Sequence, residues 1–106
     1  MKLKNYTQAA LIVGCNDASM TQDQTAKTEA AILNALSSLK IDGASISYGL
    51  GVWKGKIEKN ITVSIINNFT SGRLFSRLID QLYIILKSEL QQEDVAIIYQ
   101  NIKSNL

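Results

Sequence analysis

The sequence predicts an α+β domain of the ferredoxin-like, split-βαβ type, in which two helices cover one face of a four-stranded antiparallel sheet. Two observations carry this prediction. Segments with the period-two alternation of strands and segments with helical spacing follow one another in the order βαββαβ. The chain has 106 residues, enough apolar material for one core, so we expect a single domain over residues 1–106. A mixed sheet built from βα units is the alternative.

The first part of the chain supplies a strand and a helix. Residues 8–13 form a short apolar run, which is typical of a buried strand. Helical spacing follows over residues 22–40, with Thr21 as the expected N-cap and Gln24 completing a capping box. We expect Gly43 to end this helix in the left-handed conformation.

A hairpin is predicted next. Residues 44–53 alternate between an apolar face that includes Tyr48 and a face made mostly of serine and glycine, so they form a strand. Gly55 supplies the positive φ of a tight turn, and residues 57–67 form the returning strand.

The last third of the sequence adds one helix and one strand. A wide apolar stripe predicts an amphipathic helix that is capped by Thr70 or Ser71 and ends near Gln91. Residues 95–99 form the final strand. The split-βαβ plan then predicts the spatial strand order 4-1-3-2.

Composition removes several classes of function. The chain has one cysteine, Cys15, and no histidine, so an intrachain disulfide, a His-centred triad and a His-ligated zinc site are excluded. A formal net charge of +2 makes nucleic acid an unlikely partner. No apolar run is long enough to span a membrane, and the N-terminal one is too short for a signal peptide. We therefore expect a cytoplasmic protein that holds no metal and no cofactor, with Cys15 as a structural thiol.

The sheet face away from the helices is expected to be an interface. The first and last strands are apolar on both faces, with Ala10 and Ile12 in one and Ala96 and Ile98 in the other. Such a surface usually meets a second copy of itself, so we expect a homo-oligomer. A monomer whose tail or N-terminus covers the sheet is the alternative.

The middle of the chain, about residues 46–82, resembles CutA-type proteins, which are trimeric, ferredoxin-like relatives of the PII signalling proteins. The resemblance implies the same fold and favours a trimer. The chain lacks the Cys-Val-Asn segment before the hairpin and the His-Pro-Tyr-Glu-Val-Pro segment after the second helix, so it carries over no metal role. Its Gly-Cys-Asn-Asp and Gly-Val-Trp-Lys-Gly segments also resemble small phage proteins. The resemblance to the CutA type rests on Tyr48, Trp53, Gly55-Lys56-Ile57-Glu58, the apolar run from Val63 to Ile66, Thr70, Arg73, Leu78 and Leu82.

One candidate ligand site lies at the hairpin end of the predicted fold. The topology brings the loop with Asn16, Asp17 and Ser19 towards Lys54 and Lys56. Two lysines beside a helix N-terminus can hold a phosphate or another anion. The alternative is that these lysines are solvated charges that discourage edge pairing.

The opposite end offers a second candidate. Ser71 and Arg73 open the second helix, where an arginine can bind a phosphate through two hydrogen bonds; ordinary capping is the alternative. Trp53 and Tyr48 could stack on a base, but no basic sheet surface accompanies them. We therefore expect Tyr48 in the core and Trp53 at the interface, beside the ligand.

These features favour a non-enzymatic, homo-oligomeric binding protein that holds an anionic or nucleotide ligand in clefts between subunits. In a phage it could act against host defence by sequestering a signal nucleotide in the host cytoplasm. A protein-binding inhibitor or regulator is the alternative. An enzyme is not expected, because no pair of acidic, basic or tyrosine side chains is placed for acid–base work.

Overall fold

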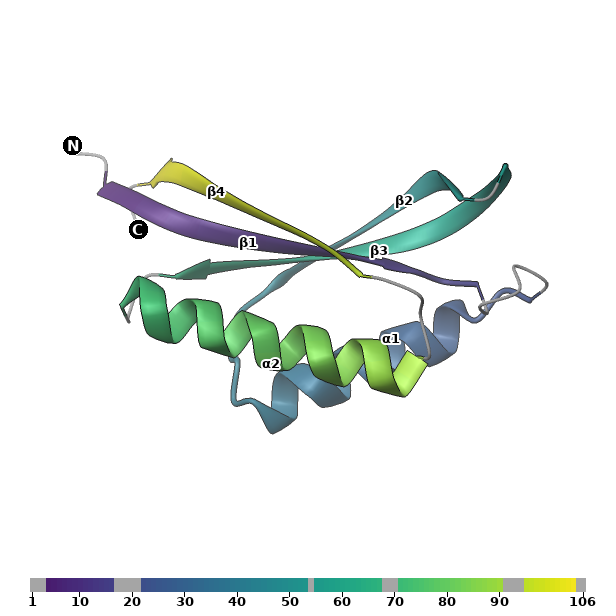
Figure 1. The fold of residues 1–106 in the computed structure, drawn as a ribbon, viewed down its shortest axis with the longest axis horizontal. Helices are drawn as coiled ribbons and strands as arrows, with labels where there is room; N and C mark the ends of the chain where they lie inside the picture. The colour runs from purple at the N-terminus through teal and green to yellow at the C-terminus, as the bar shows by residue number, and fades with distance from the viewer. Residues whose placement is uncertain (1–3, 17–21, 54, 68–70, 91–94, 105–106) are drawn as a thin grey trace.

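Two helices lie on one face of a strongly twisted four-stranded sheet in the computed structural model (Figure 1). The structure describes residues 4–16, 22–53, 55–67, 71–90 and 95–104. The ferredoxin-like βαββαβ order predicted from the sequence is confirmed. The elements are β1 (Lys4–Gly14), α1 (Thr25–Ser38), β2 (Ser45–Trp53), β3 (Lys56–Asn67), α2 (Gly72–Leu90) and β4 (Ala96–Ser104).

The strands follow the spatial order β2-β3-β1-β4, which is the predicted order 4-1-3-2 read from the other edge. Every neighbouring pair is antiparallel. Leu11 of β1 lies opposite Val63 of β3 on one side and Ile97 of β4 on the other. This register aligns the apolar residues of neighbouring strands on the same face of the sheet.

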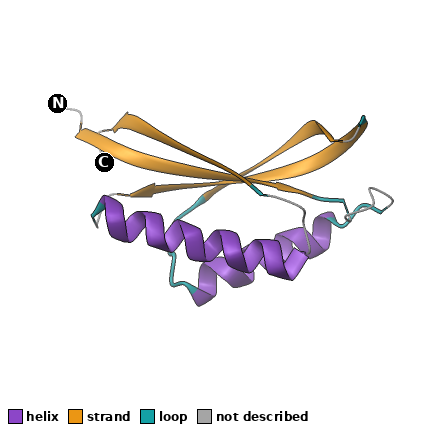
Figure 2. Ribbon diagram, viewed as in Figure 1, coloured by secondary structure: helices purple, strands orange, loops and turns teal. Residues whose placement is uncertain are grey.

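The core lies between the sheet and the helix layer (Figure 2). Alternate residues of β1 and β3 point towards the helices, and each helix contributes one apolar stripe. Burying one such aliphatic side chain stabilises the fold by about 1.5–3 kcal/mol, so the core is the main source of stability. Its fully buried large side chains include Leu11, Val13, Ile32, Ile61, Val63, Ile79, Leu82 and Leu86.

Strands β1 and β4 are longer than the sequence predicts. Their pairing extends to Lys4 opposite Ser104, and the Gln100 side-chain amide donates a 2.9 Å hydrogen bond to the Gln8 side chain. These outer segments are polar and lack an alternating apolar pattern. These outer segments are strands because their backbones pair with each other. Apolar periodicity in the sequence does not predict such pairing.

Both ends of α1 differ from the prediction. The helix begins at Thr25, where the Asp23 carboxylate accepts the backbone N–H of Thr25 at 2.9 Å, while Gln24 makes no side-chain cap. Thr21 lies outside the described residues. At the other end Lys40 adopts φ 57°, so it takes the left-handed conformation expected of Gly43. The helix ends there in a Schellman motif, in which the backbone N–H of Lys40 donates to the Ser37 carbonyl at 3.1 Å and that of Ile41 donates to the Leu36 carbonyl at 2.9 Å.

The hairpin of β2 and β3 curves away from the helices (Figure 1). Gly55 has φ 73°, as predicted for the turn. Tyr48 was expected in the core but is 64% exposed, because it lies at the edge of the helix layer, beside Glu29 and Leu33 of α1. Leu50, Val52 and Ile57 share that face and are each more than 70% exposed. No helix in the described part of the chain is long and apolar enough to cross a membrane.

Candidate functional site

The structure separates the residues predicted at the hairpin end. The backbone N–H of Asn16 donates a 3.3 Å hydrogen bond to Oε2 of Glu58. Lys56 lies two residues from Glu58 on β3, and the alternation places both on the same face. The negative charge of Glu58 therefore stands beside the position where an anion was expected. Asp17, Ser19, Lys54 and the side chain of Trp53 lie outside the described part, so their predicted roles remain predictions.

The carboxylate of Glu58 lies directly over Gly14 of β1. A Cβ atom at Gly14 would be 2.6 Å from Oε1 and 2.7 Å from both Cδ and Oε2 of Glu58. Both residues are on the sheet face away from the helices, since Ile61 and Val13 alternate with them and are buried against the helix layer. Only a glycine leaves the space that this carboxylate occupies.

Asn60 lies beside Glu58 on the same face and is flanked by two further glycines. Its Oδ1 atom would be 3.0 Å from a Cβ at Gly49, and its Nδ2 atom 3.2 Å from a Cβ at Gly51. In the register Asn60 is opposite both Gly49 and Gly14, and Glu58 is opposite Gly51. The side-chain carboxylate and amide therefore lie over bare backbone.

We call this group the Glu58 cluster: Gly14, Asn16, Gly49, Gly51, Glu58 and Asn60. It offers one negative charge and one amide that can donate and accept, both held over glycine backbone. This set of groups suits a ligand with a cationic or donor-rich end.

The segment that carries Asn16 is held against β3. The backbone N–H of Cys15 donates to the carbonyl of Lys59 at 2.9 Å, and Asn16 and Asp23 form an isolated antiparallel bridge. Lys59 Nζ and Asp23 Oδ2 form an ion pair at 3.2 Å. Hydrogen bonds from the side chain and backbone of Thr25, and then from Lys59, lower the pKa of Asp23. Asp23 therefore stays charged and links the start of α1 to β3.

Cys15 lies in the core beneath this cluster, with none of its surface exposed. Burial raises the pKa of the Cys15 thiol, although hydrogen bonds with Thr25 and Thr28 oppose the shift. The thiol therefore stays protonated at neutral pH, where it is a poor nucleophile. This environment fits the structural role expected from the sequence.

At the other end of the fold, Ser71 caps α2. Its Oγ accepts the backbone N–H of Leu74 at 3.2 Å, and its carbonyl accepts that of Phe75 at 3.0 Å. Arg73 is exposed in the first turn of the helix. The structure gives Ser71 the capping role that the sequence left open, and the two residues are not brought to the Glu58 cluster.

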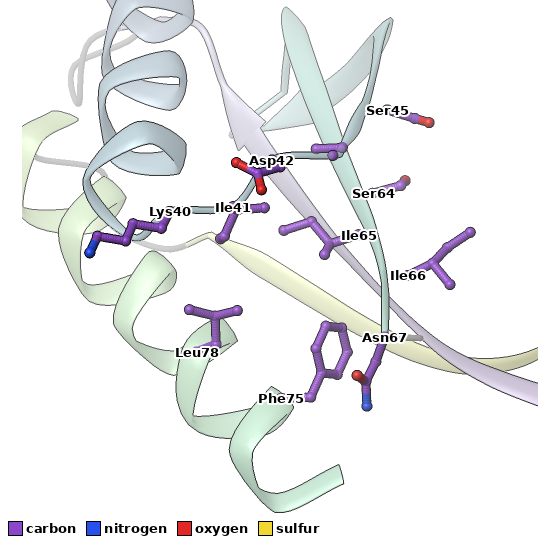
Figure 3. Close-up of a pocket in the computed structure, with 12 residues that line it drawn as sticks. Lys40, Ile41, Asp42, Ser45, Ser64, Ile65, Ile66, Asn67, Phe75 and Leu78 are labelled. Carbon is purple, nitrogen blue, oxygen red and sulfur yellow. The ribbon is translucent and has the colours of Figure 1, made fainter. Parts of the chain in front are cut away.

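A groove of about 460 Å³ lies near this second end, between β3, α2 and the connection from α1 to β2 (Figure 3). Phe75 and Leu78 of α2 point towards Ile65 and Ile41 and give the groove an apolar floor. Its rim includes Lys40, Asp42 and Asn67. Glu58 is six or more residues away along β3, about 20 Å at the strand rise.

Sequence comparisons give no match, either to protein-family models or to curated proteins. Solved structures do match. A phage SAM lyase in its apo state is 20% identical, with a TM-score of 0.75, and the match covers 96% of this chain and 92% of that chain. A phage SAM lyase in complex with S-methyl-5′-thioadenosine is 19% identical, also with a TM-score of 0.75, and the match covers 100% and 95%. A designed protein with a ferredoxin fold is 14% identical, with a TM-score of 0.43 over 96% and 88%.

These comparisons correct the function expected from the sequence. The protein with which this chain shares its fold from end to end is an enzyme, so the interpretation as a non-enzymatic protein that sequesters a signal nucleotide is wrong. The expected likeness to phage proteins is supported, and the ferredoxin-like fold follows from the order and pairing of the chain's own elements, whereas no family model supports the CutA and PII type. The ligand of the matched lyase is a small nucleoside, in agreement with a small-molecule ligand.

Proposed function

We propose that this chain is a lyase that cleaves S-adenosylmethionine (SAM) and releases S-methyl-5′-thioadenosine. The observation that carries the proposal is the fold shared over the whole length with a phage SAM lyase, at a TM-score of 0.75. The Glu58 cluster supports it independently. It presents a carboxylate and an amide that can bind the α-ammonium group of such a substrate.

The reaction needs no acid–base residue. The substrate's own carboxylate attacks its Cγ atom and forms the C–O bond of homoserine lactone. The bond from sulfur to Cγ breaks, and its electron pair stays on the sulfur, which changes from a sulfonium to a neutral thioether. No water is consumed and no proton moves. A chain without histidine can therefore accelerate the step by holding the substrate in the cyclising conformation.

The Glu58 carboxylate is best matched to the α-ammonium group of the substrate. A carboxylate placed against the sulfonium would stabilise the reactant more than the transition state, because the positive charge on sulfur disappears during the reaction. The ammonium group stays charged throughout the reaction. Binding it therefore orients the amino-acid part of the substrate without raising the activation barrier. It also draws the ammonium away from the substrate's own carboxylate, which must be free to attack.

Incubation of the purified chain with SAM tests this function. We expect S-methyl-5′-thioadenosine and homoserine lactone to form together, faster than in protein-free buffer. S-adenosylhomocysteine has the same amino-acid end but a neutral sulfur, so it should persist. Cleavage no faster than in buffer, or direct formation of homoserine with no lactone, would overturn the proposal.

We also propose that the chain works as a homo-oligomer, with a trimer favoured by the resemblance to CutA-type proteins. The support is the apolar surface of the hairpin, where Tyr48, Leu50, Val52 and Ile57 are between 64% and 73% exposed. Leaving these side chains in water forgoes about 25 cal/mol for each Å² that a partner copy could bury. Access to SAM also fits the cytoplasmic localisation expected from the sequence.

A further inference from the structure

Gly14 and Glu58 come from neighbouring strands and meet on the face of the sheet away from the helices. All three atoms of the carboxylate group lie within 2.7 Å of the point where a side chain at position 14 would begin. Real Cβ atoms do not approach other heavy atoms so closely. The carboxylate can therefore lie here, within reach of the Asn16 N–H at 3.3 Å, only while position 14 is glycine.

We propose that Gly14 is a positioning residue, which fixes where the Glu58 carboxylate meets the substrate. This inference rests on the function proposed above. Gly14 contributes no group to the reaction. Because Gly14 has no side chain, the Glu58 side chain can lie over β1 at this position. The position of Glu58 in turn sets the distance between its carboxylate and the Asn60 amide.

The backbone at Gly14 does not itself require glycine. Among the described glycines only Gly55 has a positive φ, and Gly14 lies in a regular strand. The three nearest atoms that a Cβ would meet all belong to the far end of the flexible Glu58 side chain. The variant Gly14→Ala should therefore fold, because the Glu58 side chain can rotate away while β1 keeps its register.

The first test measures the position of the carboxylate without any substrate. NMR spectra of the chain with ¹³C-labelled glutamate and ¹⁵N-labelled backbone report the Glu58 carboxyl and the Asn16 amide. We expect both signals to move in Gly14→Ala. The control is Gly72→Ala, since a Cβ at Gly72 meets nothing within 4 Å, and it should leave both signals in place. Unchanged Glu58 and Asn16 signals in Gly14→Ala would overturn the inference, whatever the chain's activity.

The second test measures the effect on cleavage of SAM. A displacement of about 1 Å in a positioning group costs about 100-fold, so we expect kcat/KM of Gly14→Ala to fall between about 10-fold and 100-fold. The melting temperature should stay close to that of the unsubstituted chain.

A double variant separates positioning from a merely structural effect. In the Glu58→Ala background the side chain that a Cβ at position 14 would meet is gone, so adding Gly14→Ala should lower kcat/KM no further. If Gly14→Ala lowered kcat/KM as much in the Glu58→Ala background as it does alone, Gly14 would act by another route, and this result would overturn the inference. If the unsubstituted chain does not cleave SAM, the proposed function fails, and the NMR comparison still decides the position of the carboxylate.

Discussion

The surroundings of Glu58 differ from those of a solvated surface charge. It is half-buried, lies over bare backbone and accepts the N–H of Asn16. A carboxylate fixed in this way has already lost much of the conformational freedom that it would otherwise lose on binding a cation. We therefore expect Glu58 to contribute more to the proposed substrate binding than an exposed glutamate such as Glu89.

Replacing Glu58 by glutamine tests its charge at almost unchanged volume. A hydrogen bond to a charged group contributes about 1.5–3 kcal/mol, so kcat/KM for SAM should fall by about 10-fold to 150-fold. Glu89→Gln, on the exposed side of α2, should keep full activity. Steady-state kinetics of the two variants check this expectation, and equal activity would remove Glu58 from the site.

Asp23 gives a pH dependence whose sign follows from its pKa. Hydrogen bonds from Thr25, followed by Lys59, lower that pKa below its ordinary value of 3.8. The unfolded state then binds the proton more readily, so the stabilisation is complete above the ordinary pKa and is lost as the pH falls through the lower folded value.

The variant Asp23→Asn keeps a side-chain oxygen at the start of α1 but carries no charge. Its melting temperature should be below that of the unsubstituted chain at neutral pH, and the difference should shrink as the pH falls below the ordinary pKa of 3.8. Thermal unfolding followed by circular dichroism over this pH range measures the difference. A gap that is constant with pH would mean that the Asp23 charge does not stabilise the fold.

Sequence reasoning reached some of these residues and missed others for a physical reason. The sequence prediction named Asn16 of this cluster and the small-residue strand face that holds Gly49 and Gly51, but it did not name Glu58 or Asn60 as site residues, although alternation places these two on one face. The contact with Gly14 depends on the register between β1 and β3, which no local pattern encodes. The expectation of a non-enzymatic protein rested on the lack of a side-chain pair placed for acid–base work, which does not exclude a reaction in which the substrate supplies its own nucleophile.

The secondary-structure elements follow apolar periodicity where one face is buried and depart from it elsewhere. Helix α2 has the wide stripe expected, and its residues Ile79, Leu82 and Leu86 are fully buried. The outer parts of β1 and β4 have no such stripe, so their length could not be predicted. The groove beside Phe75 could not be predicted from the sequence either, because it depends on how the connection from α1 to β2 packs against α2.

The stripe on α2 predicts a large difference between two neighbouring substitutions. Leu82 is fully buried, so Leu82→Ala should lower the free energy of unfolding by about 2–5 kcal/mol. Ile84 is 63% exposed on the same helix, and Ile84→Ala should change it by less than about 0.5 kcal/mol. Urea unfolding of both variants measures the two values. Similar losses would contradict the described orientation of α2.

The whole molecule is elongated, with extents of 49 × 25 × 20 Å. The helices cover the middle of one sheet face, while the hairpin of β2 and β3 projects with apolar side chains on its surface. A surface of this kind is costly for a monomer in water and is typical of an interface. The sequence indicated an oligomer from the face away from the helices, whereas the structure adds the hairpin surface on the helix side.

A charge placed in the hairpin surface tests the assembly. Val52 is 73% exposed, so Val52→Lys should leave the fold of one chain intact and reduce the molecular mass in solution to that of a monomer. Ile84→Lys places the same charge on the outer side of α2 and should leave the assembly intact. Light scattering on both variants and on the unsubstituted chain gives the mass of each. A monomeric unsubstituted chain would refute the proposed assembly.

The most direct test of the central claim follows the fate of SAM in ¹⁸O-labelled water. We predict that S-methyl-5′-thioadenosine accumulates at a rate proportional to the concentration of the chain, together with a homoserine lactone that contains no ¹⁸O. Attack by water at Cγ would instead place ¹⁸O in the hydroxyl group of homoserine. That labelling pattern, or release of S-methyl-5′-thioadenosine at only the rate seen without protein, would contradict the assignment as a SAM lyase.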